Sequence, residues 1–374
     1  MRPLRRPETT HGYVTRAQYP SQSISLRVSQ AVPKNRPIRI RPCAVAHSEP
    51  TNELTADALV SESGAFPMIA GEGLRPMTSR EQVLELLGVR SSHATAPTAS
   101  WGSFQATLEG VSIRSLTLVR DGANAIPCLF LAPPTPAPWP GAVAVHQHNV
   151  QYHLGKSEPA GLGGDPNMRY ARELAKRGVA VIVPDLVGFE ERRGPWQSDQ
   201  AFEQFVAMNL LAEGSCLQAK HVEDVLAAVS WMDGNADIEG PLGMIGHSLG
   251  GQVTLFATAC DPRVRASVIS CGLGTIESFR TMNILHNPSV YVPGILEFGD
   301  MARVASAIEN QAVFVSAGSD DVHSPLWGVH DAFDGFASGT AQLEIFDGPH
   351  DFPPATLDRA ADWLTSQLVG LRPE

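Results

Sequence analysis

The stretch Gly246-His247-Ser248-Leu249-Gly250 constrains the possible fold more than any other part of this sequence. Residues 242–245 before it form a short apolar run typical of a buried strand, and residues 252–260 after it carry apolar side chains at helical spacing. A G-x-S-x-G pattern in this position predicts a strand-to-helix turn that is too tight for a side chain at either glycine. Such a turn presents the Ser248 hydroxyl to solvent and directs the Leu249 backbone N–H toward an oxyanion. A glycine-rich turn whose serine takes no part in chemistry would show the same pattern.

Strand and helix signals alternate along most of the chain. Alternating or short apolar runs typical of strands lie at residues 112–119, 126–131, 142–145, 179–183, 244–245, 266–269, 312–316 and 342–346. Helical patterns lie between most of these runs, notably at residues 217–232 and 355–368. Two antiparallel-looking strands followed by repeated strand–helix units predict an α/β fold, with a mostly parallel eight-stranded sheet flanked by helices.

Composition divides the chain into three parts. Residues 1–60 are rich in Arg, Pro, Ser and Thr without periodicity, so we expect them to be disordered, as a transit-peptide-like or mis-called N-terminal extension. Residues 61–104 are expected to be an N-terminal helical segment, because cap-type residues open an apolar-periodic run at Thr78. Residues 105–374 would form the α/β domain. Two long connections in it, near 186–214 and 271–311, are predicted to be cap segments over a substrate pocket.

The net charge, the apolar runs and the cysteines limit the partners and the cellular location that can be expected. The formal net charge is −11, and nine of the 28 Lys and Arg lie in residues 1–50, so the main body is strongly acidic and nucleic acid is not an expected partner. No apolar run is long enough to cross a bilayer, so no membrane association is expected either. The cysteines are odd in number and lack C-x-x-C spacing, which indicates reduced thiols and a cytoplasmic location. They are Cys43, Cys128, Cys216, Cys260 and Cys271.

Two later segments can supply the partners that a nucleophilic serine needs. A serine hydroxyl requires an imidazole to accept its proton and a carboxylate to orient that imidazole. Asp320 and Asp321 follow one apolar strand run, and His350 follows the next. His323 and His330 are weaker candidates for the base, because they follow the acid within the same loop or helix.

With these segments the chain resembles the α/β-hydrolase superfamily, and within it the dienelactone hydrolase-like and acetyl xylan esterase-like branch. The resemblance rests on the stretches 246–251, 317–325, 348–350 and 145–161. It implies the α/β-hydrolase fold, with nucleophile, acid and base in the order Ser, Asp, His. In this superfamily the acid commonly lies three residues after a glycine and four before a proline. The resemblance therefore selects Asp321 rather than Asp320. Dienelactone hydrolases proper have a cysteine nucleophile where this chain has Ser248.

The resemblance also implies a second oxyanion donor in the loop His146-Gln147-His148. Glutamine stands there in place of the usual glycine, so the donor is the amide of either Gln147 or His148. Three histidines at 146, 148 and 153 could alternatively indicate a metal site. Acids at ligand spacing are missing nearby, so hydrogen bonding within the loop is the preferred interpretation, and neither a metal nor another cofactor is expected.

The expected function is that of a serine hydrolase that cleaves a small-molecule carboxylic ester through an acyl-enzyme intermediate. Ser248 would attack the carbonyl, His350 would transfer the proton, and Asp321 would orient His350. Leu249 and either Gln147 or His148 would bind the oxyanion. The alternatives are a serine peptidase, a lactone hydrolase with the same triad, or a non-catalytic ligand-binding protein with this fold.

Overall fold

The computed structural model describes residues 77–89, 96–120 and 125–370. The expected disordered segment 1–60 and Cys43 lie outside these residues, as does part of the segment 61–104. A helix begins where the sequence predicts it, at α1 (Ser79–Leu87). Thr78 Oγ1 accepts a hydrogen bond from the Glu81 N–H at 3.3 Å, and the Glu81 carboxylate accepts one from the Thr78 N–H at 2.9 Å. These two bonds form a capping box, which satisfies amide donors that the helix itself cannot.

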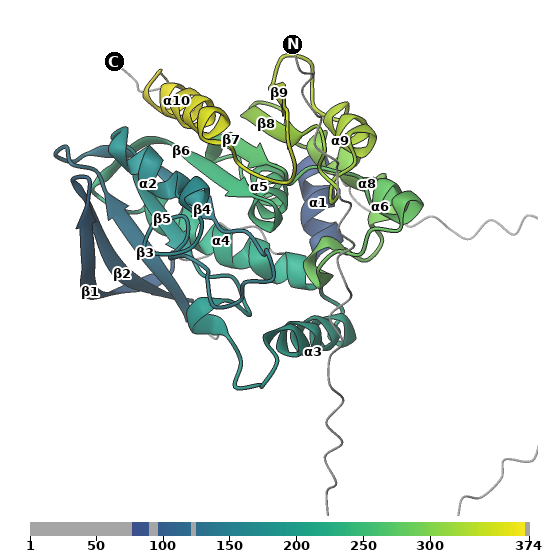
Figure 1. The fold of residues 1–374 in the computed structure, drawn as a ribbon, viewed down its shortest axis with the longest axis horizontal. Helices are drawn as coiled ribbons and strands as arrows, with labels where there is room; N and C mark the ends of the chain where they lie inside the picture. The colour runs from purple at the N-terminus through teal and green to yellow at the C-terminus, as the bar shows by residue number, and fades with distance from the viewer. Residues whose placement is uncertain (1–76, 90–95, 121–124, 371–374) are drawn as a thin grey trace, which may run out of the picture. The chain divides into compact units, whose positions relative to one another are not determined.

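A sheet of nine strands, in the order β1-β2-β3-β5-β4-β6-β7-β8-β9, forms the centre of the fold (Figure 1). The strands are β1 (Thr98–Leu108), β2 (Val111–Val119), β3 (Ile126–Ala132), β4 (Trp139–Val145), β5 (Ala180–Pro184), β6 (Ile238–His247), β7 (Val264–Ser270), β8 (Ala312–Gly318) and β9 (Ala341–Phe346). Strands β1, β2, β3 and β5 pair antiparallel, and β5, β4, β6, β7, β8 and β9 pair parallel. The predicted α/β class with a mostly parallel sheet is confirmed.

The sheet has one strand more than the eight expected from the sequence. The additional strand is β1, which lies at the edge and exposes most of its side chains. Five of its eleven residues are Ser, Thr or Gln, and its pairing with β2 is interrupted by two register shifts. An aromatic contact also anchors it: the Trp101 ring meets those of Phe130 and Trp231 edge to face at 5.6 and 5.9 Å. Because the register shifts interrupt the alternation of its apolar residues, the strand is not evident from the sequence.

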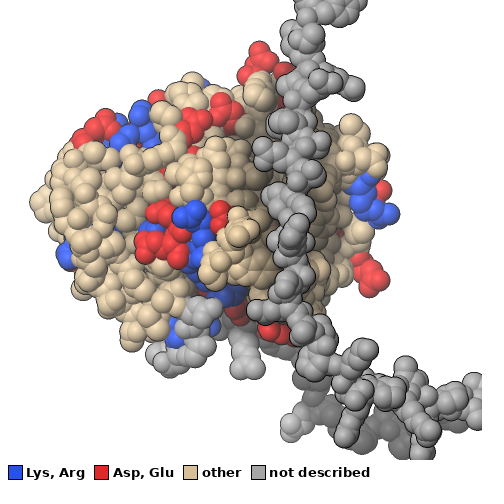
Figure 2. Space-filling view, turned by 60° about the horizontal axis from the view of Figure 1, so that its bottom comes forward, with Lys and Arg blue, Asp and Glu red and all other residues tan. Residues whose placement is uncertain are grey.

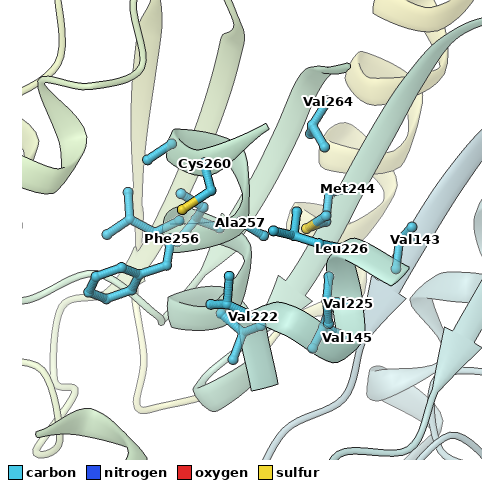
Figure 3. Packing of buried hydrophobic residues seen from close by; sticks show 14 of the residues in the cluster. Val143, Val145, Val222, Val225, Leu226, Met244, Phe256, Ala257, Cys260 and Val264 are labelled. Carbon is cyan, nitrogen blue, oxygen red and sulfur yellow. The ribbon is translucent and has the colours of Figure 1, made fainter. Parts of the chain in front are cut away.

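Helices cover both faces of the sheet (Figure 1). One apolar core contains residues of α1, α4 (Leu217–Asp233), α5 (Leu249–Cys260), α8 (Asp300–Ala305) and α9 (Leu326–Phe333), and the other contains residues of α2 (Tyr170–Lys176) and α10 (Pro354–Gly370). Successive side chains of β4 point to opposite faces of the sheet, so β4 contributes to both cores. Val143 and Val145 belong to the first core, and Ala142 and Ala144 belong to the second. Figure 3 shows Val143, Val145 and Met244 with side chains of α4 and α5. Burial on both faces fixes the register of the strands that carry the site.

Both long connections contain helical segments. The first holds η2 (Glu190–Arg192) and α3 (Asp199–Ala212). The second holds α6 (Ile276–Met282), η3 (Pro288–Val290), α7 (Ile295–Phe298) and α8, whereas a further 3-10 turn, η1 (Pro166–Met168), precedes α2. Residues of both connections line the cavity described below.

Charged side chains are mixed on the face shown in Figure 2, where Lys and Arg lie beside Asp and Glu, with broad uncharged areas between the groups. That face therefore lacks the continuous basic field with which proteins bind nucleic acids. Among the helices that the structure describes, none has the length and apolar character needed to span a membrane.

Candidate active site

Ser248 lies in the turn between β6 and α5 with φ 55° and ψ −120°. A non-glycine residue with positive φ is strained, typically by about 1–3 kcal/mol, and such strain is concentrated at functional sites. The Ser248 N–H donates to the Ser270 carbonyl at 2.8 Å, which holds the turn against β7. A Cβ at Gly246 would overlap the Gly250 carbonyl, and a Cβ at Gly250 would overlap the Val145 carbonyl. Both glycines are therefore required by close backbone contacts.

Gly250→Ala is expected to lower both stability and activity. The added methyl group must displace the backbone of β4 or of α5, and overpacking of this kind typically costs about 1–3 kcal/mol. We expect a melting temperature lower by about 3–10 °C, measured by differential scanning calorimetry, together with a loss of activity through displacement of Ser248. Gly163→Ala is the matched control, because a Cβ at this exposed glycine meets no atom closer than 3.6 Å. Equal melting temperatures for the two variants would contradict the prediction.

His350 connects Ser248 to Asp321. Its Nε2 lies 2.8 Å from the Ser248 Oγ, and its Nδ1 lies 2.7 Å from the Asp321 Oδ2. Because a carboxylate can only accept, Nδ1–H donates to Asp321 and Nε2 is left to accept the Ser248 proton. These three side chains come from the ends of β6, β8 and β9, which the parallel sheet brings to the same edge.

The Asp321 carboxylate is buried and held by three donors. Its Oδ1 accepts the N–H groups of His323 and Ser324 at 2.8 and 3.1 Å, and its Oδ2 accepts from His350. Burial raises the pKa of the Asp321 carboxyl, but the bond to His350, the charge of His350 and the two amide bonds outweigh it, so the pKa lies below its usual value. The residue is thus a carboxylate at neutral pH.

The other candidates for acid and base make no hydrogen bond to Ser248 among the described residues. Asp320 is exposed. Its backbone N–H donates to the Gly348 carbonyl at 2.9 Å and so joins it to the neighbouring turn. His330 is exposed on α9. The exposed His323 ring meets the His350 ring edge-on at 5.1 Å, but the Ser248 hydroxyl contacts His350. The geometry therefore brings together Ser248, Asp321 and His350.

A cavity of about 590 Å³ opens beside Ser248 and His350. This volume is typical of sites for small organic ligands. Gln147, His148 and Leu249 line it as well, and in the described part of the chain their backbone N–H groups have no protein acceptor. Leu249 begins α5, so its amide lies at the positive end of the helix dipole. The three residues predicted to supply oxyanion donors thus line the same cavity as Ser248 and His350.

A sequence model of the X-Pro dipeptidyl-peptidase (S15 family) matches residues 116–321, more than half of the chain. The chain belongs to this family. The matched segment includes Ser248 and Asp321 and ends before His350.

A bacterial protein and two solved structures are similar to this chain. The Bacillus subtilis (strain 168) protein named "Putative hydrolase YtaP" is 27% identical to this S15-family chain over 223 residues, which cover 58% of this chain and 72% of that protein. A cold-adapted esterase from an Arctic intertidal metagenomic library has a TM-score of 0.52 and 19% identity, and covers 72% of this chain and 99% of its own. The acetyl xylan esterase from Paenibacillus sp. R4 has a TM-score of 0.57 and 16% identity, and covers 77% of this chain and 92% of its own.

At these identities the solved structures show a shared fold. The S15-family chain therefore has the α/β-hydrolase fold that its sequence predicts. Its family and its Bacillus subtilis relative indicate that it is a hydrolase.

The loop after β4 is held by hydrogen bonds to its histidines. His146 Nδ1–H donates to the Gln147 carbonyl at 2.8 Å, and its Nε2 accepts the Leu186 N–H at 3.0 Å. Burial lowers the pKa of His146 to about 4, so the ring is neutral. His148 uses both ring nitrogens as well, through Val150 and Glu203, whereas His153 is exposed. The ring nitrogens of His146 and His148 thus hold the loop in place by hydrogen bonds.

Two groups of described side chains bring three potential metal ligands within 4.8 Å of one another. The first contains Cys271, Asp321 and His350. Asp321 and His350 are bonded to each other, and the Cys271 thiol donates to the Asp351 carbonyl at 3.4 Å. Burial, and next the charge of Asp321, raise the pKa of the Cys271 thiol to about 12, so the sulfur is protonated at neutral pH. A metal ion bound by these three side chains would have to break the hydrogen bond between Asp321 and His350.

The second group is built around a lysine. Asp185, Glu190 and Glu191 surround the buried Lys156, whose Nζ lies 2.6, 2.9 and 2.7 Å from their oxygens. Burial alone would lower the pKa of Lys156, but the charge of Asp185 and the bonds to the three carboxylates raise it above its usual value. The ammonium group thus supplies the positive charge that these carboxylates need, and it ties the loop before α2 to the connection after β5.

Proposed function

We propose that this S15-family protein is a serine esterase that acts on small uncharged esters through Ser248, His350 and Asp321. The hydrogen-bonded series from the Ser248 Oγ through His350 to the Asp321 carboxylate, at 2.8 and 2.7 Å, is the observation that carries the proposal. Its position beside a cavity that Gln147, His148 and Leu249 also line supports it further.

In this mechanism the Ser248 Oγ attacks the ester carbonyl carbon while His350 Nε2 takes the hydroxyl proton. The tetrahedral oxyanion accepts hydrogen bonds from the Leu249 N–H and from the amide of Gln147 or His148. Collapse breaks the bond to the alcohol, which leaves with the proton from Nε2, and an acyl group remains on Ser248. Water then attacks the acyl carbon, with Nε2 again taking the proton, and the acid leaves as the serine is restored.

The charges in the cavity favour an uncharged ester over a peptide. Of the described residues that line it, none is Lys or Arg, and the sole carboxylate is Glu203. That carboxylate already accepts hydrogen bonds from His148 and Tyr152. A substrate carboxylate would therefore lack a permanent counter-charge, and a peptide ammonium group would compete with two existing donors. An uncharged ester avoids both costs.

An X-Pro dipeptidyl peptidase is the second candidate, because the chain belongs to the family of that name. A lactone hydrolase with the same triad remains within the proposal, since a lactone is a cyclic uncharged ester. The choice between these substrates depends on the cavity rather than on the triad.

A substrate panel tests the proposal. We expect hydrolysis of p-nitrophenyl acetate and of acetylated sugars or neutral lactones, and labelling of Ser248 by a fluorophosphonate. We expect little release of p-nitroaniline from X-Pro p-nitroanilides. Faster cleavage of the anilides than of all esters would favour the peptidase, and an unlabelled, inactive protein would favour a ligand-binding role.

A cytoplasmic location also remains a proposal. Cys128, Cys216, Cys260 and Cys271 are free and buried thiols in the described structure, as expected for a reducing compartment. Activity that persists unchanged in reducing buffer would support it.

A further inference from the structure

A buried carboxylate joins helix α3 to the loop after β4. Glu203 of α3 is 2% exposed. Its Oε1 accepts the Nε2–H of His148 at 3.0 Å, and its Oε2 accepts the Tyr152 hydroxyl at 2.9 Å. The Nδ1 of His148 accepts the Val150 N–H at 3.0 Å, so Nε2 must carry the ring proton that is donated to Glu203. One side chain of the first long connection therefore orients the ring of His148.

Helix α3 has few other anchors. Of its 14 residues, Glu203 and Ala207 are buried. Phe205, Met208 and Leu211, on the same helix, are exposed. A carboxylate is costly to bury and persists in an interior when it is hydrogen-bonded. An apolar residue would anchor the helix at lower cost, so the packing of α3 alone does not explain an acid at position 203.

The loop that Glu203 contacts is strained. Asn149 and Val150 follow His148 with φ angles of 40° and 53°. Positive φ is unfavourable for a β-branched residue such as valine, and such conformations persist where surrounding contacts enforce them. The bond between the Val150 N–H and the His148 ring is one such contact, and the ring is itself held by Glu203. The amides of Gln147 and His148 lie immediately before this strained pair.

We propose that Glu203 is a positioning residue for the oxyanion-binding loop, acting through His148. Its carboxylate holds the His148 ring, the ring holds the turn at Val150, and the turn directs the preceding amides into the cavity. Because Glu203 belongs to α3, the packing of α3 beside the cavity also positions the oxyanion-binding amides. This inference rests on the proposed esterase function and assigns a role to a residue outside the triad.

Glu203→Gln tests the role, with Glu213→Gln as its matched control. Glu213 follows the last residue of α3 and is exposed. We expect Glu203→Gln to lower kcat by about 10- to 100-fold, because misplaced oxyanion donors lose transition-state stabilisation, with KM changed by less than about twofold. The second-order rate of fluorophosphonate labelling should fall in parallel. Glu213→Gln should leave all three quantities unchanged.

Three results would overturn the inference. Glu203→Gln could behave as Glu213→Gln does. It could raise KM for a cationic substrate at unchanged kcat, which would make Glu203 a substrate-binding residue. It could also lower the melting temperature while the folded fraction keeps its kcat and labelling rate, which would make its role purely structural.

Tyr152→Phe provides the second variant in case Glu203→Gln does not fold. It removes one of the two donors to the carboxylate and buries no new polar group, so a smaller decrease in kcat at unchanged KM is expected. Unchanged kcat would contradict the role. Ser248→Ala separates the two hypotheses: an active Ser248→Ala protein refutes the esterase mechanism itself, whereas an inactive one with a normal Glu203→Gln refutes the positioning role alone.

Discussion

Ser248→Ala is expected to lower kcat for ester hydrolysis by about 10⁶-fold, since removal of the nucleophile from a triad abolishes the function of all three members. The Ser248 Oγ is the atom that would form the acyl bond, and it lies 2.8 Å from its base. Alanine removes this oxygen and leaves the backbone of the turn unchanged, so the melting temperature should change little. Steady-state hydrolysis of p-nitrophenyl acetate measures the loss, and mass spectrometry after fluorophosphonate treatment should show no adduct.

Ser319→Ala is the control for this variant. Ser319 follows β8 at the same edge of the sheet, and its Oγ bonds to the turn at Asp347 and Gly348. Its hydroxyl has no contact with His350 among the described hydrogen bonds, so activity should remain within about twofold of the wild type. If Ser248→Ala kept more than a tenth of the wild-type kcat, Ser248 could not be the nucleophile.

The strand-to-helix turn at Ser248 could be predicted because its sequence signals are contiguous. The two glycines, the apolar run before them and the helical run after them are contiguous, and the close contacts of Gly246 and Gly250 explain why no other residue fits. The resemblance to the α/β-hydrolase superfamily likewise selected the acid by a short spacing, from Gly318 to Pro325. The structure then places Asp321 against His350 and leaves Asp320 exposed.

Features that depend on long-range contacts could not be predicted in the same way. Strand β1 is held through Trp101 by rings far away in sequence, and register shifts interrupt the alternation of its own apolar residues. Glu203 meets His148 and Tyr152 across 55 and 51 residues, so no spacing reveals it. The sequence indicated only that Glu203 lies in the connection near 186–214, which was predicted to be a cap segment over the pocket. The oxyanion loop was recognised by resemblance, but what holds it in place required the structure.

Asp321→Asn is expected to lower kcat by about 10⁴-fold. An amide group in place of the carboxylate can donate to His350 Nδ1, which favours the tautomer whose Nε2 carries the proton and cannot accept that of Ser248. The effect should be present throughout the neutral pH range, because the pKa of Asp321 lies below its usual value and the wild-type residue is charged there. The loss is measured as kcat for an activated ester. A KM and a melting temperature equal to those of the wild type would show that it does not come from weaker binding or from misfolding.

Asp320→Asn is the matched control, since it makes the same chemical change one residue earlier. Asp320 is exposed, whereas Asp321 is buried and accepts hydrogen bonds from His350, His323 and Ser324. The control should therefore keep kcat within about twofold of the wild type, as is usual for surface substitutions. Equal losses in the two variants would mean that the pair acts through the net charge of the turn. A larger loss for Asp320→Asn would reverse the assignment of the acid, whereas a loss confined to Asp321→Asn requires a directed hydrogen bond to the His350 ring.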